Sequence, residues 1–349
     1  NAVNYTANTT TNTTANITPR AITVTGAANT KVYNATTGAA ALPTITVGAI
    51  QTGDSAVRSE TYDDKNVGTG KTMIPAIVIT DGNGGNNYTV TLQNSTNGTI
   101  TVAPVTVSFT ADNKVYDGNA SADILARTVT GNIAPDGVIT ATGGTAVFNN
   151  KNVGTGKAVT ATGFTLSDSN YAVTVVTPTT ANITAKSLSV TANASDKVYD
   201  ANTVATVTFS DDRETGDVFT VTGVANFVDK NVGNNKTVNV IGIAISGTDA
   251  GNYTPNTTTV TDADITQRDI TVSATALNKV EDGDNTATVT LTNDAIFGDV
   301  VTQTYTTADF DDANVGVGKT VTVSGIAIAG LDAGNYDLTS TDALTIADI

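Results

Sequence analysis

A six-residue stretch, Lys-Val-Tyr-Asp-Gly-Asn, recurs along this chain of 349 residues at a nearly constant interval. It occupies residues 114–119, and close variants begin at Lys31, Lys197 and Lys279, so that the spacings are 83, 83 and 82 residues. A pattern that returns at a fixed period indicates repeated structural units that pack against their neighbours. We therefore expect four tandem units.

Two further motifs keep the same period and divide each unit. Asn-Tyr occurs before the end of every unit, with its tyrosine at Tyr88, Tyr171, Tyr253 and Tyr336. Asn-Val-Gly-x-x-Lys lies in the middle, from Asn66 to Lys71, Asn152 to Lys157, Asn231 to Lys236 and Asn314 to Lys319. An aromatic residue stands four positions before each of these asparagines: Tyr62, Phe148, Phe227 and Phe310.

The motifs set the expected domain boundaries. We place repeat 1 at 21–102, repeat 2 at 104–184, repeat 3 at 187–266 and repeat 4 at 269–349. Tyr5 lies 83 residues before Tyr88, so we interpret 1–18 as the terminal strand of a preceding repeat. Links of about two residues join the repeats, which favours an extended rod. Four compact units of this size would span on the order of 150 Å.

Alternating apolar and polar residues predict β-strands in every unit. Such an alternation begins repeat 1 at Ile22 and Val24. Another lies in repeat 3 at Val238, Val240, Ile243 and Ile245. A period of two indicates half-buried strands, and no segment shows a sustained helical stripe. The predicted fold class is all-β: four small β-sandwich-like or β-grasp-like domains forming an elongated rod.

Composition excludes several classes of function. The chain has no Cys, His or Trp and one Met, which excludes disulfides, thiolate or imidazole metal sites and Ser-His-Asp catalysis. A formal charge of −16 argues against binding nucleic acid or anionic membranes. No apolar run is long enough to span a bilayer as a helix. We expect no catalytic residues, no metal, no cofactor and no enzymatic activity.

The three motifs together resemble the tandem YDG-type (MBG-like) repeats of large bacterial surface adhesins, including filamentous-haemagglutinin-like proteins. The resemblance covers essentially the whole chain. It implies β-rich stalk domains exported to the cell surface, and it transfers no catalytic residue. Two repeats depart from the pattern, because repeat 1 has Asn34 where the others have Asp and repeat 4 has Glu281 in place of Tyr. Their first turns are expected to pack differently.

The repeated Tyr, Asn and Lys residues are the candidate structural residues. Packing explains tyrosines at fixed positions, whereas stacking on a sugar would need exposed rings. The glycines before Lys71 and Lys319 resemble part of a phosphate loop, but a glycine turn between strands fits better, since no helix is predicted to follow. The candidates are Tyr33, Tyr116, Tyr199, Tyr88, Tyr171, Tyr253, Tyr336, Asn66, Asn152, Asn231, Asn314, Lys71, Lys157, Lys236 and Lys319.

Three further possibilities stay open from the sequence. Acidic pairs such as Asp63-Asp64 and Asp311-Asp312 could hold calcium, although solvated charge and Asx turns are the simpler explanation. Lys and Asn residues in each unit could form isopeptide crosslinks. Asn-x-Thr/Ser triplets such as those at Asn94 and Asn182 could accept glycans.

The sequence favours a structural stalk of an extracellular bacterial adhesin or surface fibre, which projects a binding tip and contributes to adhesion or biofilm matrix. Its partners would be neighbouring repeats or subunits. One alternative is a self-assembling filament subunit that donates 1–18 as a strand to the next subunit. Another is a multivalent module whose repeats each bind a surface glycan or matrix polymer.

Overall fold

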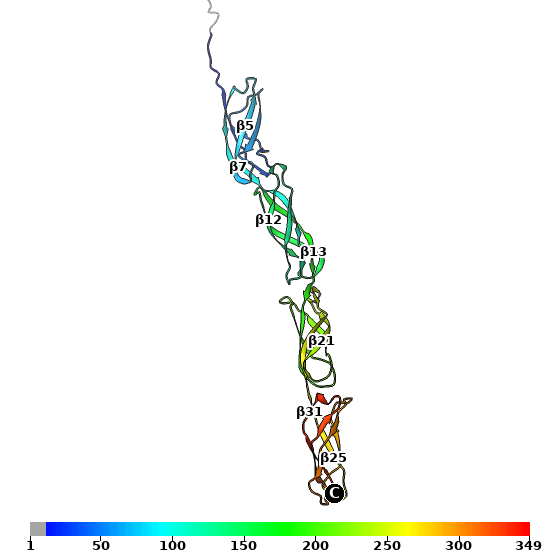
Figure 1. Ribbon diagram of the computed structural model, residues 1–349. Helices are drawn as coiled ribbons and strands as arrows, with labels where there is room; N and C mark the ends of the chain where they lie inside the picture. Colours follow the sequence, from blue (N-terminus) through cyan, green and yellow to red (C-terminus); the bar gives the residue numbers. More distant parts are fainter. Residues whose placement is uncertain (1–11) are drawn as a thin grey trace, which may run out of the picture. The chain divides into compact units, whose positions relative to one another are not determined.

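The computed structural model describes residues 12–349 of the chain. These residues form β-strands and loops, and their only helices are three short 3-10 turns, η1 (Ala134–Asp136), η2 (Ala250–Asn252) and η3 (Ala333–Asn335). Each repeat gathers its own set of strands (Figure 1). The all-β prediction is therefore confirmed.

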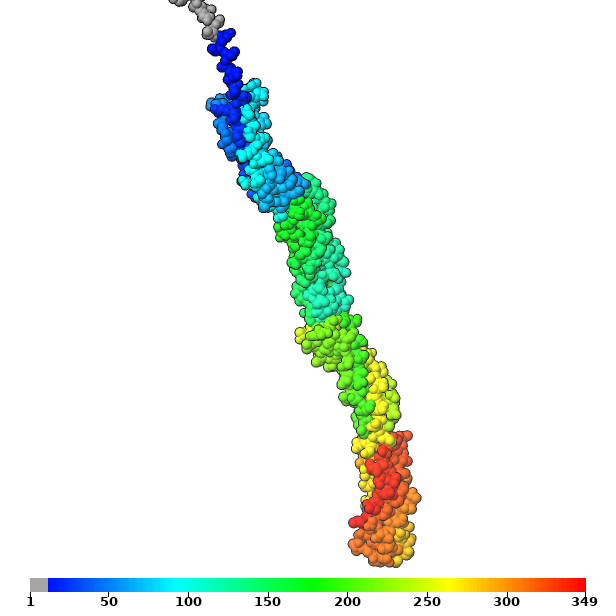
Figure 2. Space-filling view, turned by 90° about the vertical axis from the view of Figure 1, so that its left-hand side faces the viewer, coloured from blue at the N-terminus to red at the C-terminus, as the bar shows by residue number. Residues whose placement is uncertain are grey.

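The chain divides by its contacts into two compact units. The first contains repeats 1 and 2 as far as Asn182, apart from the loop Val115–Asn119. The second contains that loop together with Ile183–Ile349, which includes repeats 3 and 4. In the space-filling view the orange and red residues of repeat 4 form one closely packed body (Figure 2).

The strands of repeat 1 form two sheets, one in the order β3-β1-β6 and one in the order β2-β7-β5-β4. Their bounds are β1 (Arg20–Thr25), β2 (Asn29–Val32), β3 (Thr44–Val47), β4 (Ser55–Tyr62), β5 (Gly68–Thr80), β6 (Tyr88–Gln93) and β7 (Ser95–Thr101).

Repeat 2 has the same plan, with sheets in the orders β11-β8-β14 and β10-β12-β13-β15-β9. Its strands are β8 (Ala103–Ala111), β9 (Lys114–Val115), β10 (Ser121–Ala122), β11 (Ile124–Thr130), β12 (Ala141–Phe148), β13 (Gly154–Leu166), β14 (Tyr171–Thr177) and β15 (Thr179–Thr184).

Repeat 3 has a four-stranded sheet, β18-β23-β21-β20, and two pairs of strands, whereas repeat 4 has the sheet β28-β29-β32 and three pairs. Repeat 3 contains β16 (Lys186–Leu188), β17 (Val190–Ala194), β18 (Lys197–Val198), β19 (Val207–Asp211), β20 (Thr220–Phe227), β21 (Gly233–Ser246), β22 (Tyr253–Pro255) and β23 (Thr258–Thr266). Repeat 4 contains β24 (Arg268–Ile270), β25 (Val272–Ala276), β26 (Val289–Asn293), β27 (Thr302–Thr304), β28 (Thr307–Phe310), β29 (Lys319–Ser324), β30 (Ala327–Ala329), β31 (Tyr336–Leu338) and β32 (Asp342–Ala347).

The sequence motifs lie at fixed places in this topology. The strand that opens each repeat runs parallel to the strand that begins with the Tyr of Asn-Tyr, as β1 does with β6 and β24 with β31. In repeats 1 and 3 the Lys-Val dipeptide pairs in parallel with the last strand, as β2 does with β7 and β18 with β23. Two sheets are thus built from strands distant in sequence, and the motifs lie where those strands meet the loops.

One residue, rather than the expected two, separates the last strand of a repeat from the first strand of the next within each unit. β7 ends at Thr101 and β8 begins at Ala103, while β23 ends at Thr266 and β24 begins at Arg268. The Gln267 side chain donates to the carbonyl oxygen of Tyr336 at 2.8 Å, which ties this link to repeat 4.

Residues 12–19 form no strand, and Ile17 is 97% exposed. At the equivalent position Ile100, Ile183 and Ile265 are each 1% exposed, because they lie on the last strand of a complete repeat. The remaining part of the predicted terminal strand, residues 1–11, lies outside the described residues. The interpretation of 1–18 as a terminal strand stays a prediction.

Each core is built around one cross-strand pair. The aromatic residue before Asn-Val-Gly faces the residue two positions after the motif's lysine: Tyr62 with Met73, Phe148 with Val159, Phe227 with Val238 and Phe310 with Val321. All eight side chains are buried. In repeat 4, Val272 and Val289 from the other sheet complete this cluster, so the core fills the space between two sheets.

Phe310→Ala tests this account of the core. Phe310 is buried between the two sheets of repeat 4, so its loss should lower the free energy of unfolding of that repeat by about 3–5 kcal/mol. Leu344→Ala is the matched control, because Leu344 lies on the same sheet but is exposed. Calorimetry of both variants would contradict the account if they melted alike.

Candidate functional site: the contacts between repeats

The lysine of Lys-Val-Tyr-Asp closes the loop that follows it. Lys197 Nζ donates to Asp200 Oδ1 at 2.7 Å and to the carbonyl oxygens of Asn202 and Val204 at 2.8 and 3.1 Å. Lys31 and Lys279 make equivalent contacts with their own loops. The ammonium group thus neutralises an acid or holds carbonyl groups that the turn leaves without strand partners.

The tyrosine of the same motif leaves its own repeat and reaches the next. In the first unit, Tyr33 Oη donates to Asp136 Oδ2 of repeat 2 at 2.8 Å, and Tyr171 Oη donates to the same oxygen at 2.7 Å. Lys65 Nζ lies 2.6 Å from the other oxygen, Asp136 Oδ1. One carboxylate therefore receives two phenols and an ammonium group, drawn from both repeats.

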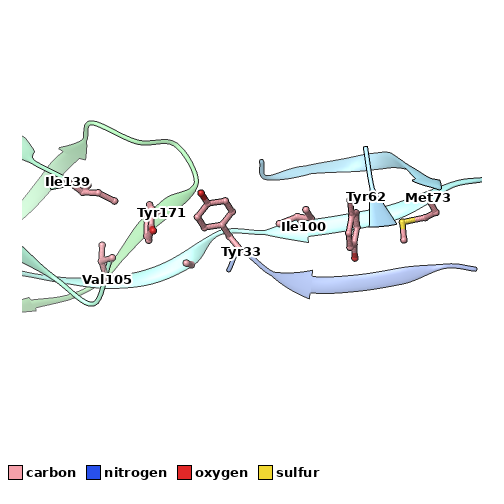
Figure 3. Packing of buried hydrophobic residues seen from close by; sticks show 8 residues of the cluster. Tyr33, Tyr62, Met73, Ile100, Val105, Ile139 and Tyr171 are labelled. Atoms are coloured by element: carbon pink, nitrogen blue, oxygen red, sulfur yellow. The ribbon is translucent and has the colours of Figure 1, made fainter. Parts of the chain in front are cut away.

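The two tyrosine rings also pack on each other. Tyr33 and Tyr171 meet edge to face, with ring centroids 5.4 Å apart and an interplanar angle of 74°. Figure 3 shows Tyr33 between the two repeats, with Ile100 on one side and Tyr171 on the other. The hydrophobic core is consequently continuous from repeat 1 into repeat 2.

In the second unit, two phenols bind one carboxylate in two places. Tyr199 and Tyr336 both donate to Asp299 Oδ2, at 2.8 and 2.7 Å, and Lys230 Nζ lies 2.7 Å from Asp299 Oδ1. Lys230 also pairs with Asp332 at 3.0 Å. The second instance is made by Tyr116, Asp217 and Tyr253, whose two hydrogen bonds are both 2.7 Å long.

The asparagines of the other two motifs bind each other across the same contacts. Asn170 Oδ1 accepts from the Val67 amide at 2.8 Å, and Asn170 Nδ2 donates to Asn66 Oδ1 at 3.3 Å. In the second unit, Asn335 makes the same two bonds with Val232 and Asn231, at 2.9 and 3.2 Å. Asn-Val-Gly of one repeat and Asn-Tyr of the next therefore form two halves of one contact.

A comparison with protein families identifies these repeats. The model of the family described as "YDG domain" matches four segments in tandem, residues 18–97, 101–181, 184–260 and 266–343. The chain belongs to the YDG domain family.

Other comparisons add little. No curated protein shows significant similarity to the chain. Among solved structures, the chain is similar to the N-terminal four Ig domains of Dscam1 isoform 6.9, with 8% identity, a TM-score of 0.21 and coverage of 93% of this chain and 97% of that one. A similarity this low supports no argument.

The lysine of Asn-Val-Gly-x-x-Lys acts inside its own YDG repeat. Its stem packs over the glycine of the motif, and a Cβ on Gly316 would lie 3.1 Å from Lys319 Cδ. Its ammonium group reaches the Asx residue seven positions earlier. The pairs are Lys71 with Asp64 and Lys236 with Asp229 at 2.6 Å, Lys157 with Asn150 at 2.7 Å, and Lys319 with Asp312.

The glycines of Asn-Val-Gly-x-x-Lys form a β-bulge at the start of a strand, where the sequence predicted a turn between two strands. The glycines lie at the start of β5, β13, β21 and β29 or just before it, and the pairing of β5 with β7 shifts register between Thr69 and Lys71. Gly70 adopts φ +67° and Asn235, its counterpart in repeat 3, adopts φ +49°. This left-handed backbone makes a bulge at the strand entrance, which explains the glycine preference.

Burial and partners shift the pKa values of the shared groups. Hydrogen bonds from Lys65 and Tyr171 lower the pKa of Asp136 from 3.8 to about 2. Burial raises the pKa of Tyr336 to about 12, assisted by its bond to Asp299. Burial alone would raise the pKa of Asp299, but the bonds from Lys230, Tyr336 and Tyr199 together lower it. The carboxylates are therefore charged and the phenols neutral at neutral pH.

The candidate residues are distributed as follows. All seven tyrosines are buried, and none exposes a ring face on which a sugar could stack. Asn66 and Asn231 lie in contacts between repeats, whereas the four lysines act within repeats. All four asparagines also donate their backbone amide to the Asx side chain two positions earlier in their own turn.

Sequence analysis missed the shared aspartates and the lysines that pair with them: Asp136, Asp217, Asp299, Lys65 and Lys230. The loops that contain these aspartates differ in length and composition between repeats, so none of the three motifs of constant period includes them. The lysines carry a clearer signal, because Lys stands immediately before Asn-Val-Gly in three of the four repeats.

The acidic pairs considered for calcium bind lysine where they are seen in contacts, as Asp64 and Asp312 do. None of the helices within 12–349 is long and apolar enough to cross a membrane.

Asp299→Ala should uncouple repeats 3 and 4. The change removes the acceptor of Tyr199 and Tyr336 and leaves Lys230 with a weaker partner, so the free energy of unfolding of the second unit should fall by about 3 kcal/mol. Hydrogen exchange at the Val232 amide, which bonds across the contact, should accelerate. Asp337→Ala is the control, since Asp337 is exposed. Unchanged exchange in Asp299→Ala would show that the carboxylate does not couple the repeats.

The first unit should weaken in acid. Because the pKa of Asp136 is lowered in the folded state to about 2, its stabilising contribution is complete above pH 4 and is lost as the pH falls towards 2. Asp136→Asn should therefore show a smaller loss of melting temperature between pH 4.5 and 2 than the wild type. Asp123→Asn, at an exposed position in the same unit, should lose as much melting temperature as the wild type over this range. Parallel curves for all three proteins would refute this role.

Proposed function

We propose that this chain is a stalk segment of a large extracellular bacterial adhesin or surface fibre, in which its YDG repeats project a binding tip and contribute to adhesion or biofilm matrix. The observation that carries the proposal is the contact between repeats. Links of one residue join the repeats in each unit, and a buried carboxylate with three partners holds them together. Such contacts resist bending better than a flexible linker would.

The use of the motif residues supports a mechanical role over a chemical one. Each recurring Tyr, Asn and Lys with a described contact closes a loop, joins two repeats or caps a turn. An active site would instead need a distinct set of residues in a cleft. The net charge of −16 suits a surface protein that must stay soluble and avoid self-association. We propose no enzymatic activity and no cofactor.

The glycan-binding alternative loses its main support, because the tyrosines that could have stacked on sugars are buried. The filament alternative keeps a specific observation in its favour. Ile17 is exposed, although it occupies the position of a core residue in the other repeats. A segment with this pattern could add a strand to another subunit.

Small-angle scattering over a concentration series tests both candidates. A compact globule of this length would have a radius of gyration of roughly 20 Å, whereas a stalk near 150 Å long would have about twice that value. We expect the larger value at every concentration, with and without residues 1–18. A value near that of a globule would overturn the stalk.

The filament candidate makes the opposite prediction about concentration. If the segment 1–18 is donated, the scattering mass should grow with concentration, and both deletion of 1–18 and the substitution Ile17→Asp should abolish that growth. Thr13→Asp is the matched control, because it changes charge in the same exposed segment without altering the apolar position.

A further inference from the structure

Repeat 1 carries half of a contact at the end that faces away from repeat 2. Tyr88 Oη donates to Asp54 Oδ2 at 2.6 Å and accepts from the Gln51 amide at 2.9 Å. We call this end of a repeat, with its Asp and the Tyr of Asn-Tyr, the acceptor end. The opposite end, with the Tyr of Lys-Val-Tyr and the Lys before Asn-Val-Gly, is the donor end.

The geometry at Asp54 matches that of the acceptor ends already in use. At each of these ends the tyrosine hydroxyl donates to its aspartate at 2.7 Å and accepts a hydrogen bond from one backbone amide. The amides are those of Ile133 to Tyr171 at 3.1 Å, Glu214 to Tyr253 at 2.8 Å and Ile296 to Tyr336 at 2.9 Å. At those sites a second tyrosine also donates to the carboxylate. Among residues 12–349, Asp54 has Tyr88 alone as its tyrosine partner.

A nearby cation does not block this end. Arg20 lies at this end, where its guanidinium donates to the carbonyl oxygen of Ala49 at 3.1 Å and its charge acts to lower the pKa of Tyr88. Arg268 occupies the same sequence position in repeat 4, where the contact with Tyr199 and Lys230 is fully formed. The acceptor end of repeat 1 is therefore preformed.

The donor end of repeat 4 differs from every other donor end. Glu281 replaces the tyrosine, and Ala313 replaces the lysine. A carboxylate brought against Asp54 would repel it, with no ammonium group to offset the charge.

We propose that the acceptor end of repeat 1 is a docking face for the donor end of another YDG repeat, one that presents both the tyrosine and the lysine, and that the end of repeat 4 is excluded from this role. Joining of YDG repeats is therefore directional and is set by one residue pair on each side. The inference concerns joining and not adhesion, so its failure would leave the stalk proposal intact.

The full chain can be converted to test this. Glu281→Tyr combined with Ala313→Lys gives repeat 4 a complete donor end. Sedimentation velocity up to about 1 mM protein, a range that detects weak association, should show the mass of the double variant roughly doubling or more, while the wild type stays unchanged. Adding Asp54→Ala to the double variant should restore the wild-type behaviour. Absence of association in the double variant, or association that survives Asp54→Ala, would overturn the proposal.

A reciprocal exchange inside the chain makes the test independent of weak association. Tyr199→Glu with Lys230→Ala places the pair of repeat 4 at a contact that exists in the second unit. Hydrogen exchange at the Val232 amide, bound to Asn335 Oδ1, should become at least tenfold faster. Val260→Ala is the control, because Val260 is exposed in the same repeat. Unchanged exchange in the double variant would show that Glu and Ala are compatible with joining, and the proposal would fail.

Discussion

A buried carboxylate shared between two repeats is the interaction on which this structure depends. The side chains of Asp136 and Asp299 are 4% and 2% exposed, and a charge in such a place must be paired and hydrogen-bonded. Two phenols bind one oxygen and an ammonium group binds the other. Because one phenol and the ammonium group come from the preceding repeat, the aspartate is fully partnered only when the two repeats are joined. Folding of one repeat and its attachment to the neighbour are thereby linked.

This linkage explains why three separated motifs share one period. The lysine of Lys-Val-Tyr-Asp fixes the loop, as Lys197 does, and so directs the tyrosine beyond its own repeat. The asparagines of the other motifs bind each other where that tyrosine arrives. Stability in an array of this kind is approximately a sum over repeats and their nearest-neighbour contacts. The motifs are thus the recurring part of the contact, and the loops between them are free to vary.

The sequence predicted what local pattern controls. Alternation located the strands that bury Ile22, Val24 and Val238, and the period fixed four repeats. It did not predict the parallel pairing of β1 with β6, because strands so distant in sequence pair through the tertiary fold. Asp136 and Asp299 were missed for a related reason. They lie in loops of unequal length, and a partner more than 60 residues away, such as Lys65 or Lys230, leaves no local trace.

Directionality follows from the chemistry of the contact. A surface that was self-complementary would let any two ends meet, whereas here one side supplies an aspartate and the other supplies a tyrosine and a lysine. In repeat 4, Glu281 and Ala313 stand where the other repeats have Tyr and Lys. These two differences replace an attractive end by a repulsive one, and neither residue belongs to the hydrophobic core. The side chains at the contacts can therefore decide which YDG repeats of separate chains join end to end, while the sheets that carry them stay the same.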